Sequence, residues 1–255
     1  MKKKRWTAII LSLAMVLAAA GCSGSDAGNS QASDGNTPSA ENGGSGTSSK
    51  DTLIIANTAG EPGNLHPYNT VSIGARLPQY MVFDGLIELD TSGKVQPGLA
   101  ESWEADEKQI TFHLREGVTF HNGEKMTAED VVFSIQEMVN NSTGGKATNY
   151  SACDVDGITT PDDYTVVIPM KEDNSAQLSY FAEMLIVNKK AYEEMGDQFQ
   201  YEPVGTGPFK ISDWVVGDVM TFESFDDYWA GAPVLKNVKI RTISEVSQAL
   251  IEVET

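Results

Sequence analysis

The side chains best able to do covalent or metal chemistry are few in this chain of 255 residues: two cysteines and three histidines. Cys22 directly follows the small residues 18–21, which leave a peptidase room at the bond before the cysteine. Its thiol is a nucleophile that can carry a covalent group. If Cys22 is modified, Cys153 has no partner, so we expect no disulfide and interpret Cys153 as a partly buried apolar residue.

The residues before Cys22 have the layout of an export signal, with basic residues at 2–5 and an apolar run to residue 20. The run is shorter than the roughly 20 residues that a helix needs to cross a bilayer. The junction 19–22 resembles the bacterial lipobox. We therefore predict a lipoprotein signal peptide at 1–21, lipid attachment at Cys22 and a location on the extracytoplasmic face of the cell membrane. An ordinary secretory signal with an incidental cysteine is the alternative.

The three histidines lack metal-ligand spacing to one another or to cysteine, so we expect no metal site and no cofactor. His113 falls on the polar face of an alternating strand and His121 in a turn, and we interpret both as surface or internally bonded side chains. His66 lies in a loop directly after the first expected strand. Because ligand contacts collect on such loops, His66, Tyr68 and Asn69 are the candidate ligand-binding residues.

Signatures of catalysis are absent from the sequence, so we predict that the protein is not an enzyme and has no catalytic residues. Pro208 removes an amide that a phosphate-binding loop at 205–208 would need. Residues 154–157 begin like a calcium loop, but the glycine comes too early and no glutamate stands at the twelfth position. The formal net charge of -18 argues against nucleic acid as a partner.

The composition divides the chain at about residue 50. Residues 22–50 contain no Leu, Ile, Val, Met or aromatic residue, so we predict a disordered Ser/Gly/Asn tether with a reach of about 30 Å. From Thr52 onward helices and strands mix without strict alternation, which predicts an α/β protein with a mixed sheet. The expected strands are 52–57, 109–115, 164–170, 185–187, 209–214, 219–225 and 238–243; the expected helices are 76–86, 127–140, 189–195 and one from Ser244.

The ends of two of these helices are informative. Thr127 can cap the second one, with Asp130 in the capping-box position. The pattern that begins at Ser244 stops at Thr255 without a glycine cap or a basic last turn. We therefore expect a chain truncated at its C-terminus.

Five motifs occur in a characteristic order: Leu99–Glu104, Thr111–Glu124, Thr127–Ser134, Pro203–Phe209 and Asp227–Trp229. Together they resemble the signature of the family 5 solute-binding proteins, the oligopeptide, dipeptide and nickel receptors of ABC importers. The resemblance covers about 53–255. It departs from the family pattern at His66, where relatives commonly have Asp in a Leu-Asp-Pro loop.

The resemblance implies a periplasmic-binding-protein-like fold of type II, in which two lobes close on a ligand and the first lobe is enlarged. It assigns 51–83 and 205–255 to the first lobe and 84–204 to an inserted subdomain, with the second lobe largely missing. The loop around His66 is then expected to face the open side of the lobe, where the second lobe would close.

The resemblance also implies a function, that of a monomeric lipoprotein that captures peptides and delivers them to ABC permease subunits. The same fold could bind nickel or another small solute, or serve as an orphan sensory lipoprotein. An exported hydrolase is the less favoured alternative.

Overall fold

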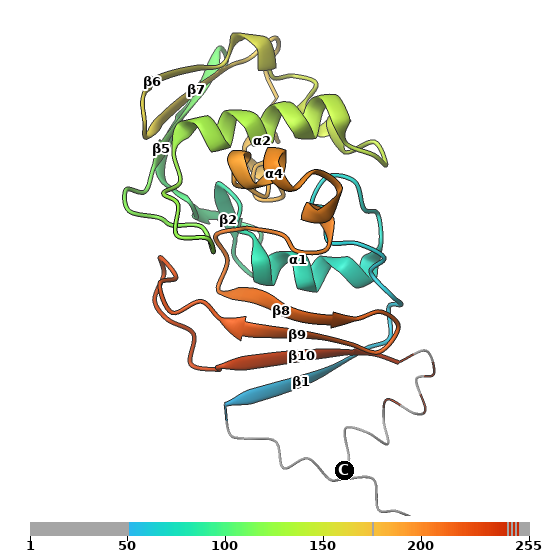
Figure 1. Ribbon diagram of the computed structural model, residues 1–255. Helices are drawn as coiled ribbons and strands as arrows, with labels where there is room; N and C mark the ends of the chain where they lie inside the picture. The colour runs from blue at the N-terminus through green and yellow to red at the C-terminus, as the bar shows by residue number, and fades with distance from the viewer. Residues whose placement is uncertain (1–50, 175, 244, 246, 248, 250–255) are drawn as a thin grey trace, which may run out of the picture. The chain divides into compact units, whose positions relative to one another are not determined.

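Two four-stranded sheets, with helices between and against them, make up the part of the chain that the computed structural model describes, residues 51–174, 176–243, 245, 247 and 249 (Figure 1). The leader, the tether and Cys22, as well as most of the helix expected from Ser244, lie outside these residues. No helix among the described residues is long and apolar enough to cross a membrane.

The first sheet joins segments that are far apart in sequence. Its strand order is β1-β10-β9-β8, formed by β1 (Thr52–Asn57), β10 (Asn237–Thr242), β9 (Val219–Ser224) and β8 (Phe209–Val215). β1 runs parallel to β10 and the other neighbours are antiparallel, so the predicted mixed sheet is confirmed. Alternate side chains of β9 and β10 are buried on one face, as the period of two requires: Met220, Phe222, Val238 and Ile240.

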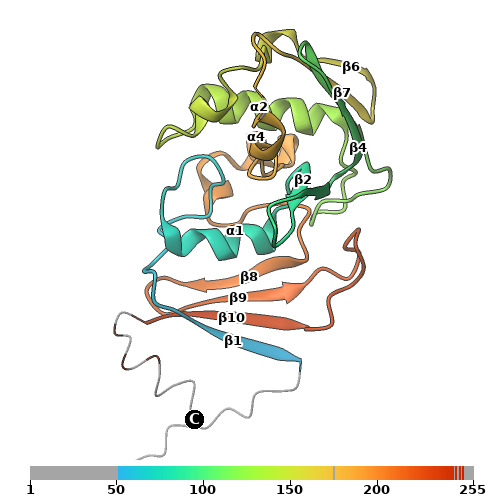
Figure 2. The ribbon, with the colours of Figure 1, turned by 180° about the vertical axis from the view of Figure 1, so that it is seen from behind.

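Helix α1 (Arg76–Val82) lies over the first sheet against β8 (Figures 1 and 2). The segment that leads into β8 approaches the last turn of α1 closely, and the Gly207 amide donates to the Val82 carbonyl at 2.9 Å. A β-carbon at Gly207 would lie 2.6 Å from the Met81 carbonyl oxygen, and one at Gly205 would overlap the Val82 carbonyl. The two glycines are therefore required by backbone packing rather than by a phosphate.

The second sheet is antiparallel, with the order β4-β5-β7-β6. Helix α2 (Ala128–Asn141) packs against β6 and β7. The predicted N-terminal cap is confirmed, because the Asp130 carboxylate accepts the Thr127 amide hydrogen at 3.0 Å. The strands are β4 (Ala100–Ala105), β5 (Gln109–Leu114), β6 (Thr159–Asp162) and β7 (Thr165–Pro169).

Short elements connect the sheets. They are the hairpin of β2 (Ile87–Leu89) and β3 (Val95–Pro97), helices α3 (Gln177–Tyr180) and α4 (Lys189–Met195), and the 3-10 turns η1 (Ile73–Ala75), η2 (Lys146–Tyr150), η3 (Val155–Gly157) and η4 (Gly196–Gln200).

A buried carboxylate, Asp84, follows the end of α1 and ties three motif residues to it. Its oxygens accept hydrogen bonds from the Thr206 hydroxyl at 2.9 Å, the Tyr228 hydroxyl at 3.1 Å and the Trp229 indole at 2.9 Å. Burial raises the pKa of Asp84, and the three donors oppose that rise. The cluster fixes the segment before β8 and the turn after β9 to α1.

Most of the expected elements are confirmed to within a few residues, but two are not as predicted. The first helix ends at Val82 rather than Leu86, because Phe83 adopts an extended conformation. Residues 185–187 are buried but form only a single bridge, between Leu185 and Gly85, so the expected strand is wrong. The sequence patterns did not reveal β2, β3, β4, β6 or α3, which are short or exposed. The division into a first lobe and an inserted subdomain stays a prediction.

Candidate functional site

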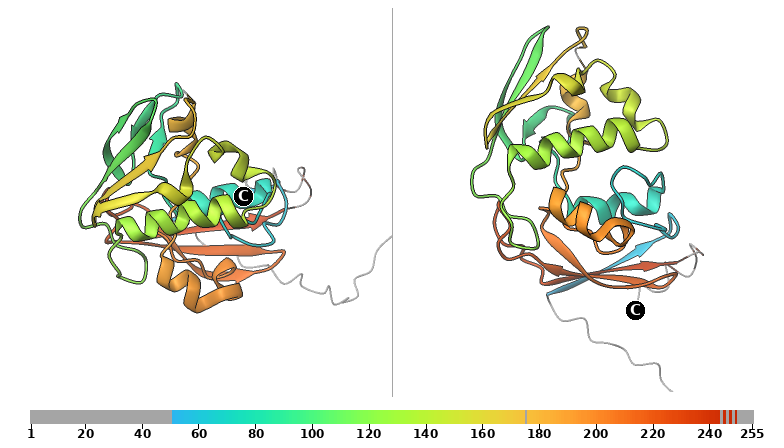
Figure 3. Two further views of the ribbon diagram at one scale, coloured as in Figure 1. Left: turned by 90° about the horizontal axis from the view of Figure 1, so that it is seen from above. Right: turned by 45° about the horizontal axis from the view of Figure 1, so that its top comes forward.

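The carboxyl ends of β1 and β10 lie at the same edge of the first sheet, since these strands are parallel. The Asn57 carbonyl accepts the Ile243 amide hydrogen at 3.0 Å, so both strands end side by side. Ligands of open α/β sheets bind in the crevice outside such carboxyl ends. Residues 58–72, here called the edge loop, leave the sheet at this point and rise toward α1 and α2 (Figure 3).

Glu61 holds the edge loop to the sheet. Its carboxylate accepts hydrogen bonds from the Trp214 indole at 3.0 Å, the Gly217 amide at 3.1 Å and the Thr242 hydroxyl at 3.1 Å. These donors belong to β8, the turn between β8 and β9, and β10. A single half-buried carboxylate therefore sets the position of the loop relative to three parts of the sheet.

His66 organises the middle of the edge loop. Its Nδ1 accepts the backbone N–H groups of Tyr68 at 3.1 Å and Asn69 at 3.2 Å, which leaves the proton on Nε2. Nε2 lies 2.9 Å from the Tyr192 hydroxyl, which in turn donates to Glu137 at 3.2 Å. Burial, aided by the charge of Lys146, lowers the pKa of His66 to about 4, so the ring is neutral at physiological pH.

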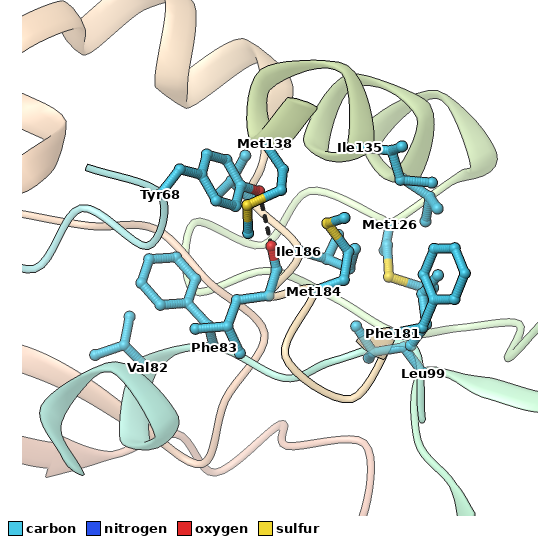
Figure 4. Packing of buried hydrophobic residues seen from close by; sticks show 14 of the residues in the cluster. Tyr68, Val82, Phe83, Leu99, Met126, Ile135, Met138, Phe181, Met184 and Ile186 are labelled. Carbon is cyan, nitrogen blue, oxygen red and sulfur yellow. Dashed lines mark hydrogen bonds between the residues drawn. The ribbon is translucent and has the colours of Figure 1, made fainter. Parts of the chain in front are cut away.

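Tyr68 is a core residue, which corrects its assignment as a ligand contact. Its side chain is fully buried near Met138 and Phe83, and its hydroxyl donates to the Leu185 carbonyl at 2.7 Å (Figure 4). Burial raises the pKa of Tyr68 far above its ordinary value. A side chain without exposed surface cannot contact a ligand in this structure.

The middle of the edge loop packs inward rather than facing an open side. The Leu65 amide donates to the Gln200 carbonyl at 2.8 Å, and the Lys146 ammonium donates to the Pro67 carbonyl at 2.7 Å. The expected orientation is therefore wrong for the stretch from Leu65 to Tyr68, and the His66 ring is engaged with α4. Asn69 is exposed and remains a prediction.

A pocket of about 320 Å³ opens where the edge loop meets α1 and η2. Val71 and Ile73 contribute apolar surface and are 72% and 74% exposed. Charged groups complete the wall: Arg76, Lys146 and Glu183. Small-molecule sites in proteins begin at about this volume and combine apolar walls with a few placed polar groups. This pocket is the candidate site.

The sequence patterns pointed to the loop but missed two residues that hold it in place. Glu61 lies in a Gly-Glu-Pro-Gly turn, which indicated only a strand end. Lys146 stands in a segment rich in glycine and threonine with no periodicity. Neither position carries a motif, so contacts distant in sequence were needed to identify them.

His121 is internally bonded, as expected. Its Nε2 donates to the Gly207 carbonyl at 2.9 Å, and burial lowers its pKa to about 4. No group of three or more His, Cys, Asp or Glu residues that could hold a metal ion occurs among the described residues.

Comparisons with known proteins agree with this geometry. Residues 94–255 match the family described as bacterial extracellular solute-binding proteins, family 5 Middle. The oligopeptide-binding protein OppA of Haemophilus influenzae is 31% identical over 69% of this chain and 37% of its own length. The oligopeptide-binding protein AppA of Bacillus subtilis is 26% identical over 100% of this chain and 47% of its own.

The solved structures show the same fold. The crystal structure of Haemophilus influenzae OppA in complex with RPPGFSPFR superimposes with a TM-score of 0.73 at 27% identity, and it covers 80% of this chain and 44% of that one. The chain thus has the α/β fold of the periplasmic peptide-binding proteins. It spans less than half the length of these relatives.

Proposed function

Since the chain belongs to the bacterial extracellular solute-binding proteins of family 5, we propose that it serves an ABC importer as the receptor that captures peptides outside the cytoplasmic membrane and delivers them to the permease. The observation that carries the proposal is the pocket at the edge loop. Its volume of about 320 Å³ suits one or two side chains of a peptide rather than a whole peptide. The remainder of the ligand would then lie along the loop.

The chemistry of the described residues favours binding over turnover. The Cys153 thiol is buried 4.0 Å from the Met170 sulfur, and burial raises its pKa to about 11, so it is a poor nucleophile. His66 and His121 use both ring nitrogens in internal contacts, which leaves neither free to act as a base. These features argue against an exported hydrolase.

Titration calorimetry of the purified protein, in its complete natural length, against tri- to hexapeptide pools tests the proposal. We expect binding at micromolar concentration or tighter, with the peptides recovered intact by mass spectrometry. Hydrolysed peptides would favour the hydrolase. Binding of Ni²⁺ without any peptide binding would favour the alternative that the protein is a nickel receptor.

The proposal includes the anchor. Cys22 would carry a diacylglyceryl group, 22–50 would be the tether, 51–83 with 205–255 the first lobe and 84–204 its inserted subdomain, in a monomeric receptor. Labelling cells with an alkyne-bearing fatty acid tests the lipid. The wild type should be labelled and Cys22→Ser should not; equal labelling of both would refute the attachment site.

A further inference from the structure

The pocket at the edge loop contains a half-buried positive charge that has no ion-pair partner among the described residues. Lys146 is half-buried, and its only hydrogen bond among these residues is to the Pro67 carbonyl. An ammonium has three N–H donors, so two remain for a ligand or water. Burial lowers the pKa of Lys146, which reflects the cost of holding this charge away from water.

No carboxylate among the described residues of the pocket forms an ion pair with Lys146. Glu183 forms an ion pair with Arg76 at 3.2 Å, so the nearest carboxylate is engaged with another cation. Glu183 and Arg76 act on Lys146 with opposite signs. The pocket wall therefore carries two cations and one anion, although the whole chain has a net charge of -18.

Asn149 extends the positive end of the pocket. Lys146 and Asn149 stand three residues apart in η2, and side chains at this spacing eclipse each other in a 3-10 helix. Both line the pocket. An ammonium and an amide can both supply N–H donors to a ligand in this pocket, and Val71 and Ile73 supply apolar surface.

We infer that this pocket receives a carboxylate of the captured peptide, with Lys146 as its charge partner and the adjoining methylene groups against Val71. The inference rests on the proposed function and refines it: among peptides, the protein prefers those that place an anionic group here. The carboxylate can come from a glutamate side chain or from the C-terminus of the peptide. A charge-assisted hydrogen bond in such a site corresponds to about a tenfold change in affinity.

Calorimetry with a matched peptide set tests the inference on the purified protein in its complete natural length. The set holds penta-alanine, its C-terminal amide, and five pairs of pentapeptides, one pair for each position, with Glu in one member and Gln in the other. We expect either one position at which Glu binds about tenfold tighter than Gln, or a free C-terminus that binds about tenfold tighter than the amide. Because the net charge of -18 of this chain disfavours anions, we expect such a preference to arise from the cations of the pocket.

Lys146→Gln is the decisive variant, since it replaces the ammonium with a neutral amide that still has N–H donors. It should lower the ratio of affinities between the anionic peptide and its neutral counterpart to about one, and Lys146→Arg should restore the preference. Lys94→Gln, at an exposed lysine of the β2–β3 hairpin, is the control and should leave the preference intact.

Three outcomes would overturn the inference. The preference could survive in Lys146→Gln, or the wild type could bind all peptides without preference; in both cases the proposed peptide receptor would stand. If no peptide of the set or of the larger pools binds, the proposed function fails and the inference fails with it.

Discussion

The interior of this molecule and its candidate ligand edge each contain a carboxylate that accepts three hydrogen bonds and a neutral histidine. The consequences differ between the two regions. In the interior, Asp84 accepts three hydrogen bonds, and the neighbouring His121 is neutral and half-buried. At the edge, Glu61 accepts three hydrogen bonds and His66 is neutral and partly buried. Asp84 is 9% exposed, whereas Glu61 is half-buried. The difference in solvent access separates a group that specifies the fold from one that positions the edge loop.

The partners of the two carboxylates support this distinction. Asp84 binds Thr206, Tyr228 and Trp229, which belong to the motifs that carried the family resemblance. The donors to Glu61 lie outside those motifs. The family motifs therefore describe mainly the interior. The candidate ligand edge has to be characterised from the structure of this chain.

The largest effect is expected from Asp84→Ala. The substitution leaves the Trp229 indole and two hydroxyls without their acceptor and opens a cavity in the interior. We expect a loss of about 3 kcal/mol or more in the free energy of unfolding, measured by urea denaturation. Asp213→Ala, at an exposed position of β8, is the control and should stay within about 0.5 kcal/mol of the wild type. A loss below about 1 kcal/mol for Asp84→Ala would contradict the role of the cluster.

The interior could be predicted from the sequence better than the edge loop could. Periodic apolar residues predicted most strands and helices, among them α2 with its Thr127 cap. The burial of one face of each element imposes this period on the sequence. Tyr68 was misassigned because an aromatic residue after a strand looks the same whether its hydroxyl reaches a ligand or the Leu185 carbonyl. Glu61 and Lys146 were missed because their partners are distant in sequence. The edge loop is held by single long-range contacts, and these leave no local pattern.

Glu61→Ala should have the second largest effect, and on affinity more than on stability. Its three donors can turn to water, so we expect about 1 kcal/mol of destabilisation. Peptide affinity should fall by about tenfold or more, because the edge loop loses its tie to the sheet. Calorimetry and urea denaturation of the same sample separate the two quantities. If Glu61→Ala lost as much stability as Asp84→Ala and kept full peptide affinity, Glu61 would be a group that specifies the fold rather than one that positions the loop.

The two histidines predict a dependence of stability on pH. Both have a pKa of about 4 in the folded protein, below the ordinary value of 6.5. Between these values the unfolded chain binds more protons, so stability is full above about pH 6.5 and declines as the pH falls toward 4. We expect His66→Asn and His121→Gln each to remove about 1 kcal/mol of this decline. Unfolding curves at pH 7.5 and 4.5 measure it. If neither variant changed the decline, the carboxylates would have to account for it.

The smallest effect concerns the aspartate that relatives commonly have in place of His66. In His66→Asp the carboxylate can accept the Tyr68 and Asn69 amide hydrogens as Nδ1 does, but it is too short to reach the Tyr192 hydroxyl. We therefore expect the variant to lie within about 1 kcal/mol of the wild type in stability. The lost contact appears only in a double-mutant cycle with Tyr192→Phe, as a coupling of about 0.5 kcal/mol. A coupling of zero would mean that the histidine only replaces the aspartate as a loop cap. A measurable one would mean that it also ties the edge loop to α4.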